Sequence, residues 1–229
     1  MNPWGRCRRM SLDLPDVERL SRRLFAVLAA ALLAVLLWKG LTGDGVVTAA
    51  RVNCDLGVWS MRFLIATLTL SPLSRWTRRP SLKRWRRPFG LASFAFAMGH
   101  AIHYLIYAQV WPAHLHFLVV KPYLFVGCIA TIMLATMAAT STNGMVRRLS
   151  PKVWRRLHTI VYLALPLSMI HGLLGFWDPY GEATVHMVAC VLLAVVRWGP
   201  GWYGGAVRLA RRIGAPARPA PTADTRTLT

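Results

Sequence analysis

Residues 88–120 form a stretch of 33 residues that contains no Asp, Glu, Lys or Arg. A bilayer core of about 30 Å is crossed by about 20 residues of apolar helix, so a charge-free stretch of this length predicts a membrane span and the connection that follows it. Other long apolar stretches precede and follow it, and 55% of the residues are hydrophobic while only 16% are charged. We therefore expect an integral membrane protein.

The alternation of apolar stretches and charged connections predicts an all-α bundle of six transmembrane helices. The predicted spans are residues 24–41, 56–74, 88–111, 122–142, 153 or 157 to 177, and 183–203. They form one domain, 24–203, between a basic segment at 1–23 and a disordered tail at 204–229. A cleaved signal peptide is the alternative for the first span, because a basic region, an apolar stretch and small residues at 47–50 follow in that order.

Basic residues collect at alternate ends of these spans. Of the 28 Lys and Arg residues, all lie in the N-terminal segment, in the second and fourth connections, or from the end of the last span onward, except Lys39, Arg51, Arg62 and Lys121. Cytoplasmic flanks are enriched in Lys and Arg, so both termini are predicted to be cytoplasmic. Because this charge lies between apolar stretches, the net charge of +20 indicates membrane topology and not nucleic-acid binding.

Histidine is the ionisable residue of the predicted membrane interior. The acidic residues near the spans, Asp44, Asp55, Asp178 and Glu182, are expected in the outer connections, which leaves no carboxylate for a proton relay or a cation site. Histidines occur instead at positions 100, 103, 158, 171 and 186, with two more at 114 and 116 in an outer connection. Ionisable residues inside a membrane are candidates for a functional site.

Two imidazoles at one depth on facing helices can hold a porphyrin through its iron. The chain has no CxxC or CxxCH sequence, so a haem would be held without covalent attachment. His158 and His171 are about 20 Å apart along an ideal helix and about 140° apart around it, and Pro166 between them can alter that angle. The spacing therefore leaves the choice of ligands open, and each histidine could also be a hydrogen-bonded core residue.

Residues 121–174 carry a family resemblance. They contain Thr140-Ser141-Thr142 before a basic loop, then Trp154, Leu157-His158, Tyr162 and His171. Together with MRFLIATLTLSPLSR and RRPFGLASFAFAMGH upstream, this pattern resembles the MsrQ (YedZ) family over about residues 20–200. These proteins are the haem-binding membrane subunits of the bacterial MsrPQ methionine sulfoxide reductase systems, related to ferric-reductase-like transmembrane domains and NADPH oxidases.

The resemblance implies a bundle that holds b-type haem through the iron ligands His100, His158 and His171. The resemblance leaves the number of haems open at one or two. His100 with His171 is the preferred outer pair of ligands, and His158 then marks an inner position. The rival pair is His100 with His158. His103 is a further candidate ligand. Arg62 is expected near the outer end of its span, where it either neutralises a haem propionate or extends to the membrane interface. The resemblance also implies FMN, although no residue identifies its pocket.

The function implied by the resemblance is electron transfer across the bacterial inner membrane to MsrP, a periplasmic molybdopterin reductase that repairs oxidised methionine. The chain itself has no substrate-converting site. It also has no GxGxxG-type fingerprint followed by a βαβ unit, the pattern that binds a nicotinamide or flavin dinucleotide, so membrane quinol or a separate flavin reductase is the expected donor. Residues 111–121 are expected to contribute to the docking surface. A small transporter or channel that uses the histidines, or a structural assembly subunit, are the alternatives.

Overall fold

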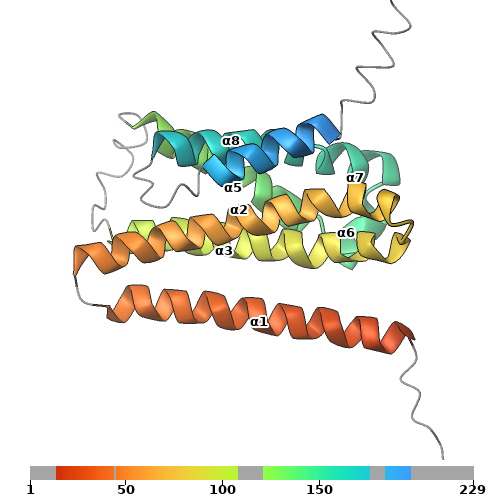
Figure 1. The fold of residues 1–229 in the computed structure, drawn as a ribbon, viewed down its shortest axis with the longest axis horizontal. Coiled ribbons are helices and arrows are strands. Elements are labelled where there is room, and N and C mark those ends of the chain that lie inside the picture. Colours follow the sequence, from red (N-terminus) through yellow and green to blue (C-terminus); the bar gives the residue numbers. More distant parts are fainter. Residues whose placement is uncertain (1–13, 44, 108–120, 176–183, 197–229) are drawn as a thin grey trace, which may run out of the picture.

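The computed structural model describes residues 14–43, 45–107, 121–175 and 184–196, and these residues form helices and short connections (Figure 1). In chain order the elements are α1 (Leu14–Thr42), α2 (Val46–Trp76), the 3-10 helix η1 (Pro80–Trp85), α3 (Arg86–Tyr107), α5 (Pro122–Ala139), α6 (Asn143–Arg148), α7 (Pro151–His158), α8 (Val161–Leu174) and the apolar helix Thr184–Val196. The predicted all-helical fold agrees with this part of the chain.

Five helical segments in the described residues are long and apolar enough to cross a membrane. They are Val17–Thr42, Val47–Trp76, Pro80–Ile106, Pro122–Ala139 and Pro151–Leu174. The predicted sixth span corresponds to the shorter helix Thr184–Val196, and the rest of that prediction, up to residue 203, lies outside the described residues. The structure is thus a bundle of apolar helices typical of a membrane protein.

The bundle is built from two helix pairs and one flanking helix. The long helix α2 packs along α3, and α5 packs along α8, whereas contacts between the two pairs are fewer; α1 lies along the outside of α2 and α3 (Figure 1). A buried hydrogen bond of 2.9 Å from Ser60 Oγ to the carbonyl of Ser93 links α2 to α3. One apolar cluster fills the space between the two pairs, with Leu64, Ala97, Leu134 and Ala164 among its buried members.

The second span begins ten residues earlier than predicted. Gly45, with φ of 89°, makes the turn after α1, and the small and apolar residues that follow continue directly into α2. A φ in this range is easily adopted by glycine. Arg51 and Asp55 consequently lie on α2, within the candidate span Val47–Trp76, so the prediction that Asp55 lies in an outer connection is wrong. Arg62 lies near the middle of α2, not near its outer end.

The fifth span is interrupted immediately after His158. Helix α7 ends there, Thr159 and Ile160 form a turn, and α8 starts at Val161. Within the turn the amide of Ile160 donates to the carbonyl of Leu157 at 3.1 Å, the tighter pattern of a 3-10 turn. The candidate span Pro151–Leu174 therefore contains a turn, and ideal helical phase does not relate His158 to His171.

The described basic segments meet at one end of the bundle. Arg84, in η1, forms an ion pair of 2.7 Å with Glu18 near the start of α1. Arg87, at the start of α3, donates a 2.6 Å hydrogen bond to the side chain of Asn143 in α6. The first helix and the second and fourth connections thus share one end, which agrees with the charge pattern in the sequence. The side of the membrane that this end faces stays a prediction.

Candidate functional site

His100 and His171 lie face to edge in the bundle. Their ring centroids are 5.9 Å apart and their ring planes are inclined by 83°. His100 belongs to α3 and His171 to α8, so one ring comes from each of the two helix pairs. Since α3 and α8 both start at the basic end, the two helices run in the same direction, as the sequence predicted for these spans, and the two histidines reach the same level.

Backbone carbonyls select the tautomer of both rings. Nδ1 of His100 lies 2.8 Å from the carbonyl oxygen of Asn53 in α2, and Nδ1 of His171 lies 2.7 Å from that of Tyr123 in α5. A carbonyl oxygen only accepts hydrogen bonds, so each neutral ring carries its proton on Nδ1 and its lone pair on Nε2. This is the tautomer of a histidine that ligates a metal through Nε2 and is oriented by a backbone carbonyl.

Two glycines allow these close approaches. A Cβ atom placed on Gly57 in α2 would lie 3.3 Å from Nδ1 of His100, and one placed on Gly127 in α5 would lie 2.5 Å from Nδ1 of His171. The second distance is too short for a real side chain, so α5 can pass His171 only with glycine at this position. Gly127 lies one helical turn after Tyr123, and the same close approach brings the Tyr123 carbonyl within hydrogen-bonding distance.

The spacing of the two rings suits ligation of a single iron. A metal–imidazole bond is about 2 Å long, so imidazoles on opposite sides of one ion have nitrogens about 4 Å apart and ring centroids roughly 6 Å apart. No group of three or more His, Cys, Asp or Glu side chains able to hold a metal ion occurs in the described residues. A metal bound here therefore needs further ligands from outside the protein, which a porphyrin provides.

His158 occupies a different environment at the basic end. Its Nδ1 lies 3.1 Å from the carbonyl of Trp154, and its Nε2 lies 3.3 Å from Oγ of Ser141. The indole ring of Trp154 stacks on the imidazole with centroids 4.0 Å apart, and the indole nitrogen donates to the carbonyl of Thr140. The structure thus brings His100 to His171 and places His158 apart from them, and which of these histidines pair as haem ligands stays a prediction.

The other described buried histidines are His103 and His186. His103 is 2% exposed, and its Nδ1 lies 3.3 Å from the side-chain oxygen of Asn53. A Cβ atom on Gly40 of α1 would collide with Nε2 of His103, so this nitrogen points at the α1 backbone. His186, on the helix Thr184–Val196, is 7% exposed. His114 and His116, and the predicted docking loop apart from Lys121, lie outside the described residues.

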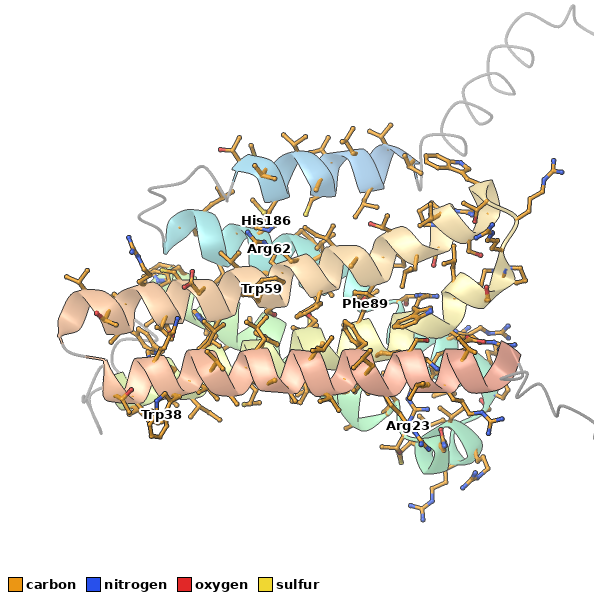
Figure 2. The ribbon with its side chains drawn as sticks, turned by 60° about the horizontal axis from the view of Figure 1, so that its bottom comes forward. Arg23, Trp38, Trp59, Arg62, Phe89 and His186 are labelled. Atoms are coloured by element: carbon orange, nitrogen blue, oxygen red, sulfur yellow. The ribbon has the colours of Figure 1, made fainter. Side chains whose placement is uncertain are left out.

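Arg62 lies on another face of α2. Its guanidinium carbon is 4.9 Å from the centroid of the Trp59 ring, a cation–π contact, and the residue is exposed (Figure 2). Gly57, which faces His100, is five positions earlier, or about 140° around an ideal helix. The suggested role of Arg62 beside a haem propionate therefore rests on the sequence alone.

The sequence analysis did not identify several of the residues that surround the candidate histidines. Asn53 and Tyr123 act through backbone carbonyls, which every residue possesses, so residue type gives no signal. Gly57 and Gly127 are glycines within spans, and such glycines are common at close helix contacts in membranes. Ser141 and Trp154 belong to the segment that carries the family resemblance, although their contact with His158 was not predicted.

Comparisons with known proteins identify the family. Residues 56–169 match the family described as "Ferric reductase like transmembrane component". Over 213 residues the chain is 36% identical to the protein-methionine-sulfoxide reductase heme-binding subunit MsrQ of Rhodospirillum rubrum, and the alignment covers 89% of this chain and 97% of the relative. The chain belongs to the MsrQ family. The MsrQ protein of Caulobacter vibrioides is 35% identical over 145 residues, which are 61% of this chain and 68% of that protein.

Another relative shares only part of its length with this MsrQ-family chain. The magnetosome protein MamZ of Paramagnetospirillum magneticum is 32% identical over 167 residues. These residues are 71% of this chain but 26% of MamZ. The family resemblance predicted from residues 121–174 and the upstream segments is confirmed by the MsrQ matches.

Proposed function

We propose that this chain is the haem-bearing membrane subunit of a methionine sulfoxide reductase system and carries electrons across the bacterial inner membrane to the periplasmic reductase MsrP. The observation that carries the proposal is the pairing of His100 with His171, each fixed by a backbone carbonyl in the tautomer that leaves Nε2 for a metal. The names of the MsrQ relatives, which describe a heme-binding subunit, support the same group.

In this proposal the protein contributes binding, orientation and an apolar environment. His100 and His171 would hold a b-type haem through its iron, and the haem would supply one-electron redox chemistry. The carbonyls of Asn53 and Tyr123 keep both rings in one orientation, which limits rearrangement when the charge at the site changes. Apolar surroundings and imidazole ligation set the reduction potential.

His158 marks a second, inner haem position. It lies 13 residues before His171, on the other side of the turn at Thr159 and Ile160, and a second carrier would divide the path of the electron. The ring is held by the Trp154 carbonyl at Nδ1, and Nε2 lies 3.3 Å from the hydroxyl oxygen of Ser141.

Electrons enter from membrane quinol or a separate flavin reductase and leave to MsrP at the outer side. Residues 111–121 contribute to the outer docking surface. Conversion of the sulfoxide belongs to MsrP. The FMN that the family resemblance implies is assigned to no residues here.

The proposal is tested by rebuilding the pathway in proteoliposomes that contain the full chain and a quinol, with purified MsrP and a methionine sulfoxide peptide outside. Sulfoxide reduction should require the chain and should be abolished by His171→Ala, whereas His103→Ala, at a buried histidine of α3, should retain it. Reduction that proceeds equally well without the chain, or with His171→Ala, would contradict the proposal.

A further inference from the structure

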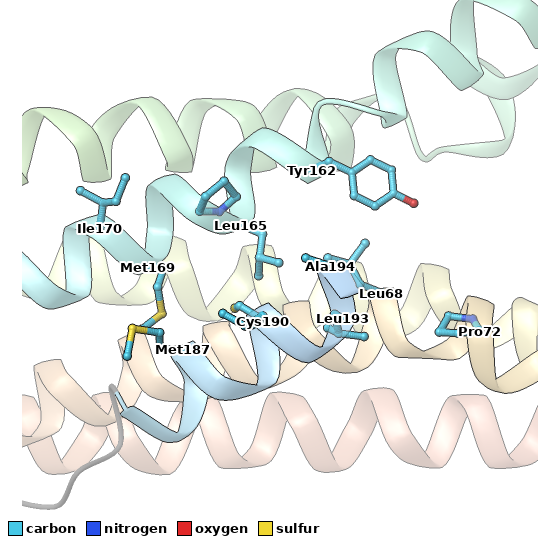
Figure 3. A pocket seen from close by; sticks show the side chains of 12 residues that line it. Leu68, Pro72, Tyr162, Leu165, Met169, Ile170, Met187, Cys190, Leu193 and Ala194 are labelled. Atoms are coloured by element: carbon cyan, nitrogen blue, oxygen red, sulfur yellow. The ribbon is translucent and has the colours of Figure 1, made fainter. Parts of the chain in front are cut away.

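One side of α8 near His171 faces an apolar cavity of about 300 Å³, which lies between α2, α8 and the helix Thr184–Val196 (Figure 3). Met169 and Ile170, the two residues before His171, line this cavity. Side chains beside a cavity have fewer packing partners than side chains in a close-packed core. The position of His171 therefore depends mainly on how α8 packs against its other neighbour, α5.

Tyr123, in the first turn of α5, contacts α8 through both its backbone and its side chain. Its carbonyl oxygen lies 2.7 Å from Nδ1 of His171. The centroid of its ring lies 5.9 Å from that of the imidazole, with the ring planes inclined by 39°. A Cβ atom placed on Gly175, one helical turn after His171, would lie 2.8 Å from Cδ2 of the same tyrosine ring. Tyr123 therefore packs closely against the end of α8 that carries His171.

Tyr104, in α3, holds Tyr123 from the other helix pair. The phenol groups of the two tyrosines are hydrogen bonded to each other. Tyr104 follows His100 by four residues, so it lies about one helical turn further from the basic end, toward the level at which α5 begins. The first turn of a helix has no preceding turn to bond its amides. Contacts made by its side chains therefore contribute strongly to the position of this turn.

These contacts form a chain that leads from α3 to His171. The phenol of Tyr104 is bonded to that of Tyr123, and the Tyr123 carbonyl accepts the Nδ1 proton of His171. A hydrogen bond at the free nitrogen of a ligating histidine fixes the orientation of the ring and raises its basicity as a ligand. A change at Tyr104 is therefore expected to reach Nε2 of His171 through Tyr123.

We propose that Tyr104 and Tyr123 are positioning residues for His171. Their hydrogen bond fixes the first turn of α5, and with it the carbonyl that holds the Nδ1 proton of His171. The consequence for a bound haem rests on the proposed function. The hydrogen bond at Nδ1 does not require haem, so the two can be tested separately.

The first test uses the full chain without haem, isotope-labelled at the histidine nitrogens and placed in liposomes. Solid-state NMR detects the imidazole N–H signals, and the loss of one signal in His171→Ala assigns it to His171. In the wild type this should be an Nδ1–H signal that is displaced downfield by its short hydrogen bond. Tyr104→Phe should move the signal upfield, because a less firmly held carbonyl makes a longer hydrogen bond.

A double variant shows whether the effect comes from the bond between the two phenols. Tyr123→Phe removes the same hydrogen bond as Tyr104→Phe, so each variant should shift the signal alone. The combined variant should shift it no further than either single variant, because the two changes act on one interaction.

Each change also has a matched control. Tyr162→Phe removes a phenol hydroxyl near the start of α8 and should leave the His171 signal in place. Gly175→Ala should displace the Tyr123 ring and move the signal. Gly172→Ala, directly after His171, adds a Cβ that meets no atom within 4 Å and should not move it.

The second test uses the chain loaded with haem. Tyr104→Phe should raise the midpoint potential, because a weaker hydrogen bond at Nδ1 makes His171 a poorer donor to oxidised iron. Loss of a direct partner of a ligating histidine lowers metal affinity about 10–100-fold, so loss of a bond one step further away should lower haem affinity by less than about tenfold. Tyr162→Phe should change neither quantity.

An unchanged His171 signal in Tyr104→Phe, or an equal shift in Tyr162→Phe, would overturn the proposal. A wild-type His171 that carries its proton on Nε2 would overturn it as well. A chain that shows the expected NMR shifts but takes up no haem would contradict the proposed function alone. A chain that binds haem, with a His171 signal and a midpoint potential that do not respond to Tyr104→Phe, would contradict this inference alone.

Discussion

The chemistry available to His100 and His171 depends on two backbone carbonyl groups, which are the same in every residue type. The carbonyls of Asn53 and Tyr123 accept the Nδ1 protons and thereby select Nε2 as the donor atom for a metal. His103 is three residues from His100 and is 2% exposed, yet its Nε2 points at the α1 backbone. The orientation of each ring, more than its presence in the membrane, therefore separates a ligand from a packing residue.

We expect His100→Ala and His171→Ala each to remove the low-spin haem signal, because a haem with one axial imidazole becomes five-coordinate or dissociates. His103→Ala should keep the signal. Electron paramagnetic resonance of the oxidised proteins and their visible spectra measure this directly. If His103→Ala removes the low-spin signal while His171→Ala retains it, the assignment of ligands is wrong.

His158 gives a separate prediction at the inner position. Replacing it with Ala should lower the haem content by about half and leave the low-spin signal of the outer pair, since His158 does not contact His100 or His171. Ser141→Ala is the control, because it removes the hydroxyl near Nε2 and keeps the imidazole. The haem-to-protein ratio checks the result. An unchanged ratio in His158→Ala would show that the inner position holds no haem.

Sequence reasoning identified the residues that carry the site but not the groups that orient them. His100 and His171 are conspicuous as imidazoles in apolar spans, and their equal level follows from the parallel direction of two predicted spans. The hydrogen bonds to Asn53 and Tyr123 depend on how α2 and α5 pack, which no local pattern specifies. The contact of Trp154 with His158 depends in the same way on how α7 ends.

At the level of elements, the residues at which a helix begins and ends were harder to predict than the presence of the helix. The apolar stretches located each span, but hydropathy assigned the first ten residues of α2 to a loop because Arg51 and Asp55 occur there. The turn after His158 was not predicted, since the sequence around Thr159 and Ile160 contains neither Gly nor Pro. The turn after His158 changes which residues share a helix face, so an ideal helical wheel does not relate His158 to His171.

The packing of α5 on α8 gives a prediction for Gly127. Alanine normally stabilises a helix by up to about 1 kcal/mol relative to glycine, but a Cβ at this position would meet the His171 ring. Gly127→Ala should therefore destabilise the protein by about 1–3 kcal/mol, the cost of overpacking, and lower its haem occupancy.

Gly144→Ala is the matched control for Gly127→Ala. It lies in α6, where a Cβ would meet no atom within 4 Å, so its thermal transition in detergent should stay the same or rise. A Gly127→Ala protein as stable and as haem-loaded as the wild type would contradict the packing of α5 against His171.

For the whole molecule, the grouping of the basic segments at one end is the main determinant of orientation. The contacts of Arg84 with Glu18 and of Arg87 with Asn143 bring three segments far apart in sequence to this end. Cytoplasmic retention of Lys and Arg predicts that this end faces the cytoplasm. The sequence could predict this arrangement because it depends on the order of spans and charges, not on side-chain packing.

Single cysteines test the orientation in a background where the native cysteines are replaced by Ser. Arg79→Cys and Arg148→Cys should react with a membrane-impermeant maleimide only after the inner membrane is opened. Lys39→Cys, at the opposite end of α1, should react in cells in which only the outer membrane has been made permeable. The reverse labelling pattern would place the basic end outside and would leave His158, not His171, near MsrP.

The measurement that tests the central claim most directly is the reduced-minus-oxidised visible spectrum of the full chain purified in detergent, combined with a pyridine haemochrome count. The account predicts a low-spin b-type spectrum and two haems for each chain, with the low-spin signal lost in His171→Ala. A colourless protein that also failed to take up added haem would contradict the account and return His100 and His171 to a packing role.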